Sequence, residues 1–175
     1  GMRVLYYYFL AKKYCPNEDH AVLEIGAGMA NFSIIHSRNV KKFSYVIVDI
    51  PEIIPAAYSN AKRLMDGDVE IFLPFEYQNF VDSSAPKKVI WFLPSQIHLL
   101  EDNSFDFFCN TESFAEMNPI VSQNYWIEVE RLLKKNAFAF LVNRISRFTG
   151  NDPKNYNDLS SPFRLSADKL HCTDI

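Results

Sequence analysis

The feature that most constrains how this chain folds is a short apolar run that ends at a pair of glycines. Residues 21–25 are mostly apolar, Gly26 and Gly28 follow, and residues 30–38 repeat apolar side chains at helical spacing. Glycine lets the backbone turn sharply where a buried strand passes into a helix. The segment therefore predicts a strand, a glycine turn and a helix in succession.

The same order of strand and helix recurs along the chain. Residues 43–50 predict a second strand, and Pro51 suits the first turn of a helix that runs to residue 64. Other strands are predicted at residues 69–73, 89–93, 105–109 and 137–142, and other helices at residues 4–14 and 125–133. Apolar strands that alternate with helices predict an α/β fold: a Rossmann-like, doubly wound, mostly parallel sheet with helices on both faces.

The length of 175 residues fits one globular domain. Within it we expect a leading helix in residues 1–20, a ligand-binding core in residues 21–147 and a loop-rich C-terminal segment in residues 148–175. Gly1 before Met2 has the form of a scar left by tag removal.

Charge and composition disfavour several classes of partner. The formal net charge of −3 provides no broad cationic surface, so we expect neither nucleic-acid binding nor membrane insertion. The sequence shows no signal peptide, and its three cysteines are too far apart for a disulfide framework, which predicts a cytoplasmic location. His20, His36 and His171 form no cluster with acidic residues, so we predict no metal site.

The glycine pair gains meaning from an acidic residue farther along the chain. Glycines alone indicate only a tight turn, but Asp49 ends the second predicted strand, near the spacing at which a carboxylate meets both ribose hydroxyls of a bound nucleoside. Asp is also a favoured helix N-cap, and Pro51 follows it, so Asp49 has a second, structural interpretation. The two roles are compatible.

Glu24 and Asn31 separate the cofactors that such a turn can hold. A carboxylate two residues before Gly26 would repel a pyrophosphate, but it complements the ammonium and sulfonium groups of S-adenosylmethionine. The third glycine of the dinucleotide-binding pattern is absent because Asn31 stands there. An NAD-dependent oxidoreductase remains the less favoured alternative.

Residues 20–145 resemble class I S-adenosylmethionine-dependent methyltransferases, through L-E-I-G-A-G at 23–28, V-I-V-D at 46–49 and D-N-S-F-D at 102–106. The resemblance implies that the cofactor contacts the following residues: Glu24, Gly26, Ala27, Gly28, Asp49, Ile50, Ser95, Gln96 and Asn110. Two departures stand out. Ala30 replaces a frequent third glycine, and the acid that usually follows the third strand of these enzymes is missing, with Ser95 and Gln96 in that region.

D-I-P-E at 49–52, N-T-E-S-F-A-E-M at 110–117, Tyr125 and N-R at 143–144 resemble sugar O-methyltransferases of bacterial surface-polysaccharide synthesis. That resemblance implies methyl transfer to an oxygen acceptor, a sugar hydroxyl. A hydroxyl nucleophile needs a base, and Glu116 and His98 are the candidate catalytic groups because they follow predicted strands at the ligand-binding edge. Each has an ordinary alternative, as a capping or ion-paired carboxylate and as a solvated histidine.

A function of a different class remains open. The chain is short, and related enzymes usually add segments that choose the acceptor, so it also fits a cofactor-binding fragment or non-catalytic module that lacks its acceptor domain. A homo-oligomer is a further expectation, as is a small-molecule or sugar acceptor.

Overall fold

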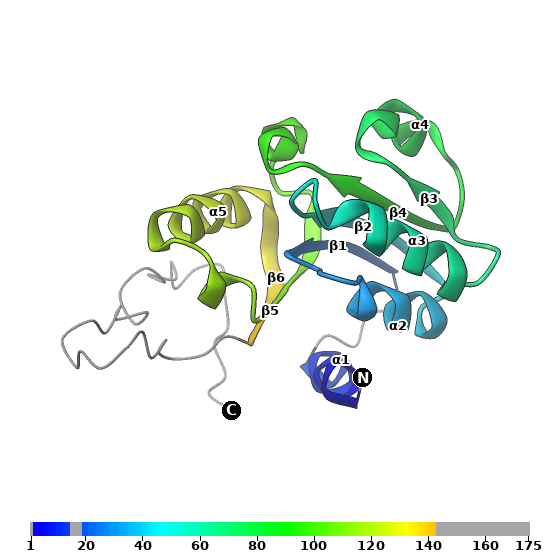
Figure 1. The fold of residues 1–175 in the computed structure, drawn as a ribbon, viewed down its shortest axis with the longest axis horizontal. Helices are drawn as coiled ribbons and strands as arrows, with labels where there is room; N and C mark the ends of the chain where they lie inside the picture. The colour runs from blue at the N-terminus through cyan, green and yellow to red at the C-terminus, as the bar shows by residue number, and fades with distance from the viewer. Residues whose placement is uncertain (1, 15–18, 143–175) are drawn as a thin grey trace.

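The computed structural model describes residues 2–14 and 19–142 of the chain. Its strands are β1 (Asp19–Ile25), β2 (Lys42–Val48), β3 (Glu70–Phe72), β4 (Lys87–Phe92), β5 (Phe105–Thr111) and β6 (Leu133–Val142). They form one sheet in the order β3-β4-β2-β1-β5-β6, and every neighbouring pair among them is parallel (Figure 1). The predicted parallel sheet is confirmed.

Helices cover both faces of this sheet, as predicted. The α-helices are α1 (Met2–Tyr14), α2 (Asn31–Asn39), α3 (Ile54–Leu64), α4 (Tyr77–Asp82) and α5 (Pro119–Leu132), and three short 3-10 helices are η1 (Pro74–Glu76), η2 (Pro94–Leu99) and η3 (Phe114–Glu116). Helices α1, α2 and α3 lie on one face, and α4 and α5 lie on the other (Figure 1). Side chains of η2 pack on the same face as α4 and α5.

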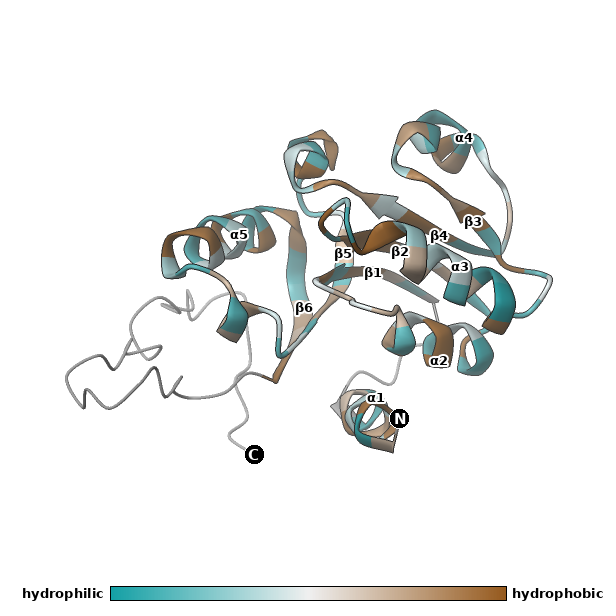
Figure 2. Ribbon diagram, in the orientation of Figure 1, coloured by the Kyte–Doolittle hydropathy of each residue, from teal (hydrophilic) through white to brown (hydrophobic). Residues whose placement is uncertain are grey.

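Alternate residues of the strands pack into two separate hydrophobic cores, one on each face of the sheet. In β1, Val22 packs with Phe32 of α2, whereas its neighbour Leu23 packs with Trp126 of α5. Figure 2 accordingly shows hydrophobic residues in the strands and both hydrophobic and hydrophilic residues on the helices. Burial on both faces explains why the strands read as apolar runs without a polar alternation.

Three elements start three or more residues away from their predicted positions. The helix expected to start at Pro51 begins at Ile54, after a turn. The helix expected at residue 125 begins earlier, at Pro119, where the Asn118 side chain accepts a hydrogen bond from the backbone N–H of Ile120. Strand β6 begins at Leu133, before the predicted residue 137, and an irregularity in its pairing with β5 accommodates the longer strand.

The strand order creates a switch point between β1 and β5. From β1 the chain crosses to β2 on one side, whereas β5 pairs with β1 on the other side. In open parallel sheets, ligands bind at the carboxyl ends of strands beside such a point. The predicted segment 148–175 lies outside the described residues. Among the described residues, no helix is long and apolar enough to cross a membrane.

Candidate functional site

The connection from β1 to α2, which we call the glycine turn (residues 26–30), has a left-handed backbone at three positions. The φ angles are +71° at Gly26, +55° at Gly28 and +59° at Ala30. Only glycine adopts this region without a steric cost, so the first two positions match their residues. Ala30 carries the strain at the position where the resembled family often has glycine.

Position 26 must be glycine because Ser113 occupies the space that a side chain there would need. A Cβ at this position would lie 2.2 Å from Oγ of Ser113 and 2.4 Å from its Cβ. The close approach that requires a glycine at position 26 is therefore one to the loop after β5, and the predicted contact of Gly26 with the cofactor stays a prediction.

Asn110 and Ser113 hold that loop against the end of β1. Both side chains donate to the backbone carbonyl of Ile25, at 2.8 Å from Asn110 Nδ2 and 3.0 Å from Ser113 Oγ. Asn110 is fully buried, and its Oδ1 accepts from the backbone N–H of Phe114. These bonds give Asn110 a structural role beneath the turn, and its predicted contact with a cofactor remains a prediction.

Gly28, in contrast, faces open space. No heavy atom lies within 4 Å of the position that its Cβ would take. Its backbone N–H donates to Oδ2 of Asp49 at 3.0 Å, while Oδ1 of Asp49 accepts from the backbone N–H of Ile50 at 2.8 Å. The structure thus brings together the glycine turn and Asp49, the two halves of the predicted site, although they are far apart in the sequence.

The N-cap alternative for Asp49 is wrong. Helix α3 has Ile53 at its N-cap position, and Asp49 lies before the turn that precedes it. Asp49 is 8% exposed, and burial raises the pKa of its carboxyl group although backbone N–H groups oppose the shift. Each carboxylate oxygen retains lone-pair capacity for a further donor.

Glu24 projects from β1 into the core beneath the turn. It is 1% exposed, and its Oε2 accepts a hydrogen bond of 2.8 Å from the hydroxyl of Tyr45 on β2. Burial raises the pKa of the Glu24 carboxyl group to about 7, the Tyr45 hydrogen bond opposes this shift, and the nearby Asp49 charge adds to it. Cys109 of β5 is a further hydrogen-bonding neighbour.

Glu24 and Asp49 therefore form a buried acidic pair, the term we use for these two side chains from here on. The groups that shift their pKa values are carboxyl, phenol, thiol and backbone N–H groups, and no basic side chain of the described residues is among them. Buried charges in proteins are normally paired with an opposite charge. The arrangement can accordingly receive a cationic ligand.

The segment after β4 carries three further predicted site residues in η2. Ser95 and His98 are exposed. Gln96 is engaged: its Oε1 accepts from the backbone N–H of Leu93 at 2.8 Å, and its Nε2 donates to the carbonyl of Pro74 at 3.0 Å. Gln96 thus caps η2, and its predicted contact with adenine stays a prediction.

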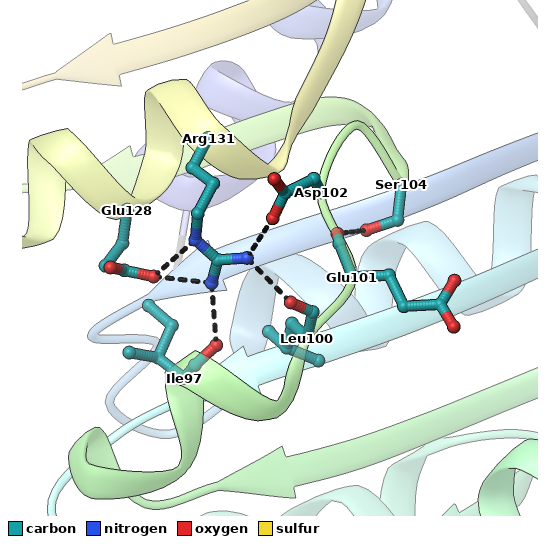
Figure 3. A network of polar contacts seen from close by, with 7 residues as sticks. All are labelled: Ile97, Leu100, Glu101, Asp102, Ser104, Glu128 and Arg131. Carbon is teal, nitrogen blue, oxygen red and sulfur yellow. Dashed lines mark hydrogen bonds and ion pairs between the residues drawn. The ribbon is translucent and has the colours of Figure 1, made fainter.

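Arg131 of α5 fastens the far end of η2 (Figure 3). Its guanidinium donates to the carbonyls of Ile97 at 3.2 Å and Leu100 at 2.8 Å, and it also pairs with Glu128 and Asp102. A cation that meets the last carbonyls of a helix satisfies groups that have no intrahelical partner. Sequence reasoning missed this residue because its partners come from three separate segments.

The other side of the switch point is formed by the segment after β5 and by α5. Glu116 is exposed on η3. Tyr125 of α5 stacks on Phe114, with ring centroids 6.3 Å apart and an interplanar angle of 17°. Burial raises the pKa of Tyr125, and the negative charge of Asp49 adds to this shift. From the sequence, Tyr125 was predicted only as part of a family resemblance.

In the described ranges, 2–14 and 19–142, no group of three or more His, Cys, Asp or Glu side chains is arranged to hold a metal ion. His171 lies outside those ranges.

Comparisons with known proteins assign the fold. No protein-family model matches the sequence, and no curated protein matches it significantly. The fold is similar to that of a SAM-dependent methyltransferase from Aquifex aeolicus, at a TM-score of 0.57 and 18% identity over 85% of this chain and 70% of the other.

Two archaeal structures give the same result. The PH0226 protein of Pyrococcus horikoshii has a TM-score of 0.56 and 23% identity over 78% of this chain and 54% of its own length. A SAM-dependent methyltransferase of Methanosarcina mazei has a TM-score of 0.52 and 23% identity over 71% of this chain and 52% of its own length. The chain thus has the Rossmann-like fold seen in SAM-dependent methyltransferases, and it spans about half the length of these two proteins.

Proposed function

We propose that this chain binds S-adenosylmethionine and transfers its methyl group to an oxygen acceptor, a sugar hydroxyl. The observation that carries the proposal is the buried acidic pair, Glu24 and Asp49, beside the open side of Gly28. The cofactor's ammonium and sulfonium groups are the positive charges that such a pair lacks. Its ribose offers two neighbouring hydroxyl donors for the two oxygens of Asp49.

The residues present fit this cofactor. Glu24 would attract its cationic end, the backbone at Gly28 would contact it without a Cβ in the way, and Asp49 would hold the ribose. The side chain of Ile50, 48% exposed and next to Asp49, would cover one face of the adenine. When bound, S-adenosylmethionine supplies a methyl group made electrophilic by its positively charged sulfur.

We place the acceptor on the β5 and α5 side of the switch point. Glu116 on η3 follows β5 on that side, whereas His98 on η2 follows β4 on the other side. Both side chains are exposed and are the candidates to take the proton of an acceptor hydroxyl. Tyr125 adds a hydroxyl that would orient the acceptor. The sugar class of the acceptor depends on the sequence resemblance described above.

The second candidate function is a cofactor-binding module whose acceptor-binding part is on another segment or subunit. The observation that favours it is length, because the chain spans only about half of two of its structural neighbours. NAD binding is less favoured, since the Glu24 carboxylate would repel a pyrophosphate.

The setting proposed for this reaction is the cytoplasm. There the protein would meet a small-molecule or sugar acceptor, with neither nucleic acid nor membrane insertion involved, and a homo-oligomer would be one way to complete the acceptor site.

Calorimetric titration tests the cofactor proposal. We expect wild-type protein to bind S-adenosylmethionine and S-adenosylhomocysteine but not NAD. Asp49→Asn should weaken the binding of both adenosyl ligands by about tenfold or more, because a neutral amide accepts ribose hydroxyls less well. Asp66→Asn, in an exposed turn, is the matched control and should bind as wild type does. Preferential binding of NAD would contradict the proposal.

Turnover separates the enzyme from the module. Transfer of a labelled methyl group to hydroxylated acceptors, nucleotide sugars included, supports the enzyme, and cofactor binding without any transfer supports the module. If Glu116→Gln and His98→Ala together leave transfer unchanged, neither is the base.

A further inference from the structure

Among the residues that the structure describes, Tyr45 is the one whose hydroxyl donates to Glu24. It lies on β2, beside β1, with Oη 2.8 Å from Glu24 Oε2 and 3.6 Å from Cys109 Sγ. Tyr45 and Glu24 are 0% and 1% exposed. Bulk water therefore does not compete for this hydrogen bond.

The surroundings of Glu24 otherwise favour its neutral form. Asp49 is close enough for its negative charge to oppose ionisation of Glu24, and Cys109 faces it from β5. On the helix side, the ring of His36 from α2 packs on Tyr45, with centroids 5.4 Å apart. Burial lowers the pKa of His36 to about 3, so this ring contributes no positive charge.

The Tyr45 hydroxyl remains a donor at every relevant pH. Burial, with the neighbouring Cys109 and Glu24, raises its pKa well above the usual value. A hydrogen bond donated to a carboxylate stabilises the ionised form, and a bond to an ionised group is stronger than one between neutral groups. The Tyr45 hydrogen bond therefore lowers the pKa of Glu24, whereas burial and the charge of Asp49 raise it.

We propose that Tyr45 is a positioning residue of the cofactor site, whose hydroxyl orients the Glu24 carboxylate and holds it in the ionised form that attracts a cationic ligand. This inference rests on the function proposed above. A protonated Glu24 offers no charge to an ammonium or sulfonium group, so loss of the Tyr45 hydroxyl should weaken cofactor binding most at the pH values where Glu24 is protonated.

The first test needs no cofactor. The carboxyl carbon of Glu24 is followed by NMR in protein labelled with ¹³C-glutamate, over a pH titration of wild type and Tyr45→Phe. We expect the Glu24 midpoint to lie near pH 7 in wild type and to rise by about one pH unit in Tyr45→Phe. An unchanged midpoint would overturn the proposal, whether or not the protein binds S-adenosylmethionine.

The second test compares two ligands across pH. S-adenosylmethionine carries the cationic end, and 5′-methylthioadenosine carries the same adenosine without it. Tyr45→Phe should bind S-adenosylmethionine about three- to tenfold more weakly at pH 7 and recover at pH 9, with unchanged affinity for 5′-methylthioadenosine. Equal weakening for both ligands at every pH would show a merely structural role and overturn the proposal.

Tyr8→Phe is the matched control. Tyr8 is 1% exposed in the same core, and its hydroxyl has no hydrogen-bond partner among the described residues. It should leave both the Glu24 midpoint and the ligand affinities unchanged. If wild type binds neither ligand, the proposed function fails, and the titration without cofactor still decides the role of Tyr45.

Discussion

Gly26 and Gly28 share a left-handed backbone but differ in what surrounds them. The space beside Gly26 is filled by Ser113, whereas the space beside Gly28 is open. At the scale of single residues, the two halves of the sequence motif thus have separate purposes. Gly26 allows the loop after β5 to pack against the end of β1, and Gly28 leaves the glycine turn accessible to a ligand.

Paired alanine substitutions separate these purposes. Gly28→Ala should cost about 1 kcal/mol of unfolding free energy, from the left-handed backbone alone, and should weaken S-adenosylmethionine binding about tenfold because its methyl group enters the open space. Gly26→Ala should cost several kcal/mol, because it adds the clash with Ser113. Urea denaturation and calorimetry measure the two effects. Equal losses of stability would contradict this division.

Glu24 makes a second prediction at this scale. Its pKa rises from 4.5 to about 7 on folding, so between these pH values the folded protein holds a proton that the unfolded chain releases. Glu24 should consequently contribute a fall in stability as pH rises through this window, of about 3 kcal/mol at 1.36 kcal/mol per pH unit. This contribution is the difference between the profiles of wild type and Glu24→Gln, because His36 contributes the opposite slope below pH 6.5. Glu24→Gln should lack this slope in urea denaturation at a series of pH values; equal slopes would refute the assignment.

At the scale of elements, η2 depends on groups outside its own sequence. Gln96 caps its start, and Arg131 of α5 binds the carbonyls near its end. The element that flanks the proposed adenine site is thus fixed by a helix that follows β5. A change in α5 should therefore reach the cofactor site through η2.

Arg131→Met tests this connection. It keeps the length of the side chain but removes every guanidinium donor, so we expect a loss of about 1–3 kcal/mol in unfolding free energy. Amide hydrogen exchange of residues 97–100 should become faster, and 5′-methylthioadenosine should bind more weakly. Arg63→Met, on the exposed side of α3, is the control. Unaltered exchange in residues 97–100 would show that Arg131 does not hold η2.

The same element shows what sequence reasoning could and could not reach. Strand β4 was predicted from its apolar run, but the short helices after β3 and β4 were not. Each short helix is preceded by a leucine and starts with a proline. In η1, a side-chain oxygen of Glu76 accepts a hydrogen bond of 2.7 Å from the backbone N–H of Leu73. In η2, a side-chain oxygen of Gln96 accepts one of 2.8 Å from the backbone N–H of Leu93. This L-P-x-E/Q pattern was an available signal. The Arg131 contacts had no such signal.

At the scale of the whole molecule, the two cores differ in the ionisable groups that they bury. The core beneath α1, α2 and α3 contains the buried ionisable groups Glu24 and His36, whereas the core beneath α5 is mostly apolar. The alternation of strands with helices predicted the sheet, and the spacing between the glycines and Asp49 predicted that the glycine turn lies beside Asp49. They did not predict the burial of Glu24 against Tyr45, because that contact depends on the register between β1 and β2.

This difference predicts an acid-sensitive fold. Burial lowers the pKa of His36 from 6.5 to about 3, so below pH 6.5 the unfolded chain binds a proton that the folded protein excludes. His36 should contribute a fall in stability as pH drops through this window, of up to about 5 kcal/mol, which Glu24 opposes above pH 4.5. Urea denaturation should show wild type losing more stability than His36→Phe as pH drops from 6.5 to 3. Profiles of the same shape in the two proteins would contradict the buried, neutral His36.

The central claim is that a buried acidic pair receives a cationic cofactor, and proton release on binding tests it most directly. S-adenosylmethionine is titrated at pH 7 in two buffers of different ionisation enthalpy, into wild type and Glu24→Gln. With the Glu24 pKa at about 7, wild type should release roughly half a proton per site more than the variant does. Binding with equal proton release in the two proteins, or no binding by wild type, would contradict the account.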